Sequence, residues 1–286
     1  MAVKMIRGGG SIKARRPQAV GPRDDALMGL RLPESKSIPS DSLQDYSILL
    51  FGRKKIGKTS LAAQFEDALF LMCEPGGKAL RIRQVQVRSW PELKRYVDLA
   101  IEDKETRTIV VDTADFAYEY CMDYVCDKMA MGHPSDEAYG KGWKAVRKEF
   151  TEVIGKILHS GKGVVFISHS RDDEFKTRHS ESYHKTVSSM PGQAKDVLEG
   201  LVDIWANYDY DGQRRVLIIG GSEEVDAGHR LEERFKNADG SPVNRIDMGD
   251  NPAEGYRNFV SAFNNRPVAA SRPHGQSVKR KLTIKR

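Results

Sequence analysis

The sequence is poor in cysteine and has no long apolar stretch. Its 286 residues include three cysteines, Cys73, Cys121 and Cys126, and no C-x-x-C pair, so we expect neither a disulfide framework nor a structural zinc site. No run reaches the roughly 18 apolar residues that a membrane-spanning helix needs. Three glycines, residues 8–10, stand where a secretory leader would carry its apolar stretch. We therefore predict a protein of the reducing cytoplasm with no membrane partner.

Positive charge is concentrated at the two ends of the chain. Residues 1–32 hold seven Lys or Arg against two Asp, and residues 266–286 hold seven and no acid. The whole chain carries +6, so the part between these ends is acidic. Like-charged ends with few large apolar residues are typical of disorder. We predict a disordered basic arm over residues 1–42, a folded domain over 43–265 and a disordered basic tail over 266–286. These ends serve either solubility or attraction to a polyanion such as nucleic acid.

Short apolar runs alternate with helical patterns between the two ends. The runs predict strands at 47–51, 68–72, 85–87, 108–111, 163–167, 202–210 and 215–219, and the periodic segments predict helices at 59–67, 91–100, 116–129, 140–160 and 256–263. Residues 171–193 are polar and show no clear period. Buried strands that alternate with helices predict an α/β fold with a mainly parallel sheet flanked by helices. In such sheets ligands bind beyond the carboxyl ends of the strands.

One motif is specific by itself. Residues 52–59 read GRKKIGKT, which satisfies G-x-x-x-x-G-K-[ST] between a predicted buried strand and a predicted helix. The glycines let several main-chain N–H groups face one point, and the helix adds its positive end there. Lys58 would reach the terminal phosphates and Thr59 would hold Mg²⁺. The predicted nucleotide-binding residues are Gly52, Arg53, Lys54, Lys55, Ile56, Gly57, Lys58, Thr59 and Ser60.

Polar residues at three other strand ends complete the predicted site. Asp112 follows the strand 108–111 and is predicted to bind Mg²⁺ together with Thr59. Hydrolysis also needs a group that positions or deprotonates water. Glu74 and Asp115 are both candidates; Glu74 is favoured because it ends a strand, whereas Asp115 can cap the next helix. His169 ends a further strand and either senses the γ-phosphate or is an ordinary hydrogen-bonded histidine.

Taken in order, four segments resemble the RecA-like ATPases. They are the phosphate loop, ALFLMCE at 68–74, IVVDT at 109–113 and VVFISH at 164–169. More closely, the chain resembles phage AAA-domain nucleotide-binding proteins, including the RecA-like single-strand annealing proteins of phage recombination, over about residues 45–235. The resemblance implies a RecA-like P-loop NTPase fold, ATP and Mg²⁺ as ligands, a homo-oligomer and, for a phage protein, the host cytoplasm.

The resemblance also implies roles for individual residues. Glu74 falls on the catalytic glutamate of the family, and His169 falls on the residue that couples ATP to DNA. Together with Lys58, these two residues form the predicted catalytic set. Residues 171–193 fall on a mobile DNA-binding loop. Its stacking and basic side chains are Phe175, Tyr183, Arg171, Lys176, Arg178, His184 and Lys185, and its acidic ones, which oppose DNA, are Asp172, Asp173, Glu174 and Glu181. A neighbouring subunit supplies a cation to the γ-phosphate, for which Arg230, Arg234 and Lys236 are candidates.

Three functions fit this sequence. The first is an ATP-binding and ATP-hydrolysing protein of phage recombination or replication that binds single-stranded DNA and promotes annealing. Single-stranded DNA is then the main partner, and a single-strand-binding protein or another replication protein is a further candidate. The second is a nucleotide-dependent switch or assembly ATPase that acts on a protein without DNA. The third is a small-molecule kinase, which residues 171–193 fit only loosely as a lid.

Overall fold

The computed structural model describes residues 32–176 and 182–268. The chain divides into a first unit, Met1–Pro39, and a second, Ser40–Arg286. Of the first unit, residues 32–39 are described, and they contain no helix or strand. Most of the predicted basic arm and tail, residues 1–31 and 269–286, lies outside the described residues. In the described part of the chain, no helix is long and apolar enough to cross a bilayer.

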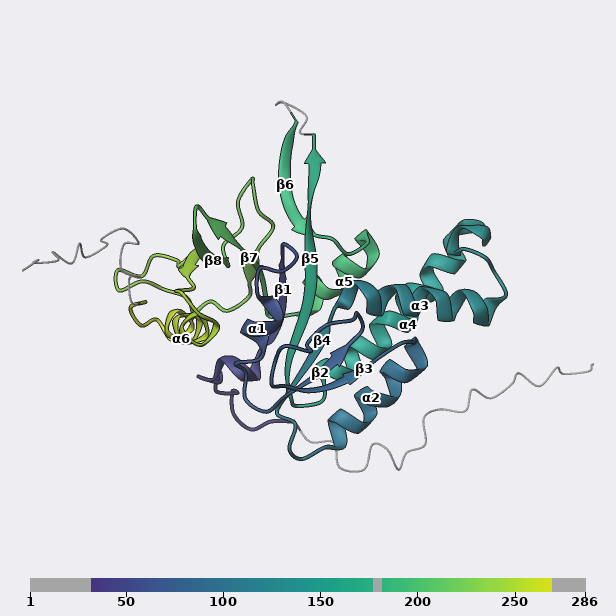
Figure 1. The fold of residues 1–286 in the computed structure, drawn as a ribbon, viewed down its shortest axis with the longest axis horizontal. Coiled ribbons are helices and arrows are strands. Elements are labelled where there is room, and N and C mark those ends of the chain that lie inside the picture. The colour runs from purple at the N-terminus through teal and green to yellow at the C-terminus, as the bar shows by residue number, and fades with distance from the viewer. Residues whose placement is uncertain (1–31, 177–181, 269–286) are drawn as a thin grey trace, which may run out of the picture. The chain divides into compact units, whose positions relative to one another are not determined.

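The second unit is built on a mixed sheet (Figure 1). Its strands are β1 (Ser47–Gly52), β2 (Ala68–Met72), β3 (Arg83–Gln86), β4 (Thr108–Asp112), β5 (Gly163–Phe175), β6 (Tyr183–Ser188), β7 (Ile204–Asp211), β8 (Arg214–Ile218), β9 (Gly228–His229) and β10 (Arg245–Asp247). The order in the sheet is β10-β8-β7-β1-β5-β4-β2-β3. The six neighbouring strands β7, β1, β5, β4, β2 and β3 are parallel to one another. The predicted mainly parallel α/β sheet is confirmed.

Helices cover both faces of this sheet. They are α1 (Lys58–Ala62), α2 (Trp90–Glu102), α3 (Ala114–Met129), α4 (Lys141–Leu158), α5 (Gly192–Leu201) and α6 (Pro252–Phe263), with single turns η2 (Leu43–Asp45), η3 (Pro134–Asp136) and η4 (Ala138–Gly140). The apolar faces of α2 to α5 form one core with the sheet, and those of α1 and α6 form another core on its other face. Because β1 and β4 are buried along their whole length, they read as continuous apolar runs.

Local signals placed several of these elements. Ser89 accepts a hydrogen bond from the Glu92 N–H at 3.4 Å and caps α2. The helix predicted at 59–67 is wrong in length, because α1 ends at Ala62. After it, Gln64 and Phe65 donate to carbonyls three residues back, which tightens the chain. The chain can thereby enter β2 at Ala68 directly.

The largest difference from the prediction lies at residues 171–193. The segment is not a loop: β5 continues beyond its predicted end to Phe175 and pairs antiparallel with β6, and α5 follows from Gly192. This β5–β6 hairpin, residues 170–175 paired with 183–188, leaves the main sheet (Figure 1). Because its side chains are exposed or half-buried except at Val187 and Ser188, its sequence carries no apolar alternation that would reveal two strands.

Candidate functional site

The phosphate loop joins β1 to α1 at the carboxyl edge of the sheet. At Gly52, the last residue of β1, a Cβ atom would lie 2.1 Å from the main-chain oxygen of Tyr208 on β7. Only glycine fits this close approach. Gly57 has a φ of 110°, which side-chain-bearing residues rarely adopt. The two fixed glycines of the motif are therefore explained by strand contact at one end and by backbone conformation at the other.

The remaining loop residues divide between surface and interior. Arg53, Lys54 and Lys55 are exposed, and Ile56 is buried in the core under the loop. Ser60, the last predicted ligand residue, is half-buried in α1. One apolar side chain, Ile56, thus anchors the loop to the core, while Arg53, Lys54 and Lys55 lie at the surface.

Lys58 lies buried at the start of α1, where only 6% of the residue is exposed. Its ammonium donates hydrogen bonds to the carbonyl oxygens of Gly52, at 2.8 Å, and Arg53, at 2.9 Å. Burial lowers the pKa of this ammonium to about 8, although the nearby carboxylates of Asp112, Asp115 and Glu74 act in the opposite direction. The structure thus brings Lys58 close to three of the predicted acidic residues.

Thr59 and Asp112, the two predicted Mg²⁺ ligands, are in direct contact. The Thr59 hydroxyl donates to the Asp112 carboxylate at 2.7 Å, and Asp112 is 2% exposed. Burial raises the pKa of Asp112, and the hydrogen bond from Thr59 partly offsets that rise. A hydroxyl and a carboxylate side by side are hard oxygen ligands of the kind Mg²⁺ prefers, so the two residues fit a magnesium site.

Glu74 and His169 form the next pair along this edge. The His169 Nε2 lies 3.3 Å from the Glu74 Oε2, and both side chains are largely shielded from solvent. His169 lies beside Gly52 in the register of β5 with β1, and Glu74 follows β2 and donates its main-chain N–H to the Asp112 oxygen at 3.4 Å, so both residues lie at the carboxyl edge of the sheet. The other ring nitrogen, Nδ1, is buried and has no hydrogen-bond partner among the described residues.

Asp115, the alternative base, is engaged elsewhere. Its carboxylate accepts hydrogen bonds from the Ser168 hydroxyl at 3.2 Å, from the His169 main-chain N–H at 3.3 Å and from the Ser189 hydroxyl. Both of its oxygens therefore accept hydrogen bonds from the middle of β5 and from the residue after β6, whereas Glu74 contacts the His169 ring.

Sequence reasoning missed the support from β7 and β8. The Arg215 guanidinium donates to the Ile56 carbonyl oxygen at 3.0 Å, and Arg53 forms an ion pair with Asp209 at 2.8 Å. Arg215 also lies 5.6 Å from the centre of the Tyr210 ring. No local signal announces these contacts, because Arg215 is 159 residues away from Ile56.

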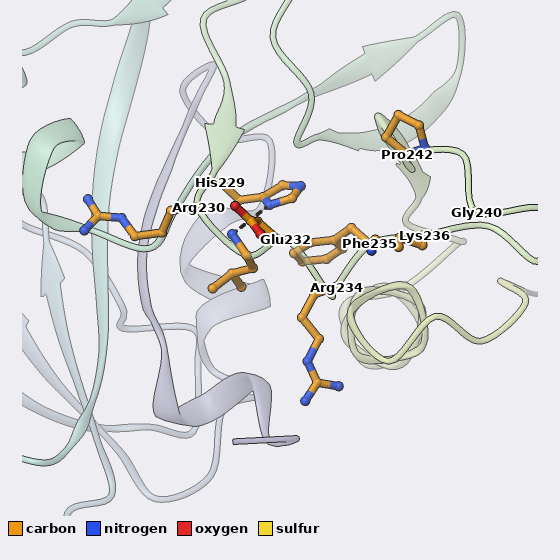
Figure 2. Close-up of a pocket in the computed structure, with 9 residues that line it drawn as sticks. His229, Arg230, Glu232, Arg234, Phe235, Lys236, Gly240 and Pro242 are labelled. Carbon is orange, nitrogen blue, oxygen red and sulfur yellow. Dashed lines mark hydrogen bonds between the residues drawn. The ribbon is translucent and has the colours of Figure 1, made fainter. Parts of the chain in front are cut away.

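The three candidate trans-acting cations line a hollow of about 540 Å³ near β9, which also includes His229 and Phe235 (Figure 2). Each has a partner within the chain. Arg234 donates to the Ser40 carbonyl oxygen at 2.7 Å and lies over the Phe263 ring at 4.7 Å. Arg230 donates to the Gly200 carbonyl oxygen, and Lys236 pairs with Glu233 at 3.3 Å.

The β5–β6 hairpin carries the residues predicted to contact DNA. The rings of Phe175 and Tyr183 stack on each other with centres 5.8 Å apart. Arg171 is paired with Asp173, and Lys185 with Asp226. Lys176 and His184 are exposed, while Arg178 and Glu181 lie outside the described residues. Asp172 accepts from Thr186 at 2.7 Å, and Glu174 faces His184 across the strands.

Comparisons with known proteins match the chain to a family, to a curated relative and to solved structures. A family model described as an AAA domain matches residues 44–231. The SPbeta prophage-derived uncharacterized protein YorG of Bacillus subtilis (strain 168) is 28% identical over 145 residues, or 48% of this chain and 45% of that protein. The chain therefore spans less than half the length of this relative. The KaiC-like protein PH0186 of Pyrococcus horikoshii OT3 is 13% identical, with a TM-score of 0.41 over 73% of this chain and 88% of that one.

Proposed function

The chain belongs to the AAA domain family, and from that premise we propose that it binds ATP with Mg²⁺ at residues 52–60 and hydrolyses the nucleotide. The observation that carries this proposal is the convergence of Lys58, Thr59 and Asp112 at the end of β1, with Thr59 and Asp112 joined at 2.7 Å. Lys58 binds the terminal phosphates, and the main-chain N–H groups of the loop bind the others.

Thr59 and Asp112 hold Mg²⁺ in this proposal. A bound Mg²⁺ neutralises charge on the phosphate oxygens. Asp112 suits this role because it is buried and already accepts a hydrogen bond from the Thr59 hydroxyl. The cation would replace that hydrogen bond with two oxygen ligands from adjacent strand and helix ends.

Glu74 is the proposed base that positions the attacking water. It supports this role better than Asp115, because the Asp115 carboxylate already accepts three hydrogen bonds from protein groups. His169 holds the Glu74 carboxylate at 3.3 Å and connects it to β5. Since β5 runs on into the hairpin, a change at Glu74 can reach Phe175 through one strand.

We assign single-stranded DNA as the partner of the hairpin and of the basic ends. Support comes from the Phe175–Tyr183 ring pair, which offers an aromatic surface for bases, from exposed Lys176, and from the charge of residues 1–42 and 266–286. Similarity to a prophage-derived protein supports a phage setting, and in that setting the proposed role is recombination or replication, with annealing as the activity. Other copies of the chain are expected partners, with Arg230 or Lys236 as the cation supplied in trans.

One observation favours a second function. The described residues 170–176 and 182–188, which comprise the hairpin and its flanks, hold three acids and three Lys or Arg. They are Asp172, Asp173, Glu174, Arg171, Lys176 and Lys185. A surface with balanced charge suits a protein partner as well as a polyanion. The second candidate is therefore a nucleotide-dependent switch that acts on a protein through the same hairpin.

The ATPase rate with and without single-stranded DNA, at about 50 and 200 mM salt, tests these functions. We expect DNA to stimulate turnover and the stimulation to fade at the higher salt. A flat response in a protein that binds ATP would refute the DNA assignment and favour the switch. No calorimetric uptake of Mg·ATP or Mg·GTP would refute the nucleotide site itself, and phosphorylation of an added nucleoside monophosphate would indicate a kinase.

A further inference from the structure

The β5–β6 hairpin leaves the main sheet after His169, and the main chain of Thr186 also joins β6 to Glu224 and Asp226. Up to His169, β5 is paired with β1, and beyond it only β6 pairs with this strand. The main-chain bond from the Ser189 N–H to the His169 oxygen, at 2.8 Å, closes the junction. Side-chain contacts at this point hold the part of the hairpin that lies nearest to the nucleotide site.

A single carboxylate binds both sides of that junction. Asp115, in the first turn of α3, accepts from Ser168 and His169 on β5 and from Ser189 just after β6. The hydroxyls of Ser168 and Ser188 lie 2.8 Å apart and connect the strands beside it. Hydrogen bonds to a charged acceptor are among the stronger ones in proteins.

The same carboxylate stands close to the nucleotide site. It lies three residues after Asp112, and its charge raises the pKa of Lys58 against the larger effect of burial. Asp115 accepts a hydrogen bond from the main-chain N–H of His169, and the ring of His169 contacts Glu74. Asp115 thus touches the junction of the hairpin on one side and the support of the proposed base on the other.

We propose that Asp115 is a positioning residue that couples the nucleotide site to the β5–β6 hairpin. It fixes His169 against Glu74 and holds both hairpin strands, so that a rearrangement around the phosphates changes the hairpin and a partner on the hairpin changes turnover. The two effects are reciprocal where they concern binding affinities. This inference rests on the proposed function. It gives Asp115 a coupling role, whereas the sequence offered it only as a base or a helix cap.

Hydrogen–deuterium exchange in the full-length chain tests the coupling. We compare wild type, Asp115→Asn and, as a control on an exposed part of α3, Asp123→Asn, each alone and with a Mg²⁺-bound, non-hydrolysable ATP analogue. In the nucleotide-free protein, Asp115→Asn should speed exchange of segments 168–176 and 182–190 by about tenfold or more. The analogue should alter exchange there in wild type and the control, and much less in Asp115→Asn.

Kinetics separate coupling from a structural role. Asp115→Asn should lower kcat for ATP by about tenfold while KM and the melting temperature stay near those of the control. A raised KM with unchanged kcat would overturn the proposal. Should Asp115→Asn fold poorly, Ser189→Ala, which removes one of the three contacts, should show the same pattern in weaker form.

The outcomes distinguish the two levels of inference. If wild type takes up no nucleotide in calorimetry, the proposed function fails. Exchange of the nucleotide-free hairpin then still tests whether Asp115 holds the two hairpin strands. If hairpin exchange in Asp115→Asn equals that of Asp123→Asn in both states, the coupling role is refuted even though ATP binds.

Discussion

Replacing Lys58 with methionine should stabilise the nucleotide-free protein. In the folded chain, burial lowers the pKa of Lys58 from 10.5 to about 8, which corresponds to about 3 kcal/mol against the charged form at neutral pH. Methionine removes that cost but leaves the carbonyl oxygens of Gly52 and Arg53 without their donor, at about 1–2 kcal/mol in total. The expected net gain is about 1–2 kcal/mol in the free energy of unfolding.

The pH dependence of the free energy of unfolding gives a second test of this effect. The folded pKa of Lys58 lies below its unfolded value, so the unfolded chain binds more protons between about pH 8 and 10.5. The contribution of Lys58 to stability therefore rises with pH in that window, and below pH 8 its cost is fully present. The advantage of Lys58→Met should shrink as pH approaches about 10.

Urea denaturation at pH 7 and pH 9.5, without nucleotide, measures both effects. Lys54→Met, in the exposed part of the same loop, is the matched control and should change little. Mg·ATP should raise the melting temperature of wild type and of the control, but not of Lys58→Met, since a bound ligand stabilises only a protein that binds it. A Lys58→Met variant less stable than wild type at pH 7, or equally favoured at both pH values, would refute the reasoning.

Three further predictions concern the same site and the ends. Glu74→Gln should keep ATP affinity but lower kcat by about 100-fold or more; normal turnover in a single-cycle assay would instead point to Asp115. Gly52→Ala should abolish nucleotide binding in calorimetry, because its Cβ would lie 2.1 Å from the main-chain oxygen of Tyr208. Retained binding would contradict this prediction and show that β7 can move away from the loop. Deleting residues 266–286, which carry seven Lys or Arg, should weaken DNA affinity and flatten its salt dependence while basal ATPase persists; unchanged affinity in a filter-binding titration would leave the tail a solubility device.

Residues at strand ends were the most predictable part of the site. Asp112 and Glu74 follow apolar runs, and parallel strands bring their carboxyl ends to one edge. The structure accordingly places Asp112 against Thr59 and Glu74 near Lys58. Their catalytic and metal-binding roles remain predictions that the variants above test.

Elements with little burial were the least predictable. The β5–β6 hairpin is held by main-chain bonds between its strands, so its sequence shows polar residues without a period. By contrast, α5 carried a missed signal, since Ala194, Val197 and Leu198 are buried at helical spacing. The start of α6 was also marked by Asn251, whose side chain accepts from the Glu254 N–H at 3.0 Å, with Pro252 between them.

The sequence by itself determined the phosphate loop, the alternation of buried strands and helices, and the acidic residues at strand ends. These follow from local rules: glycine where the backbone must curl, and apolar runs where a strand is covered on both faces. Tertiary structure alone decided that Arg215 supports Ile56, that His169 meets Glu74 and that Asp115 holds the hairpin. Such contacts join residues up to 159 positions apart, and strand order and register, which no local pattern encodes, bring them together.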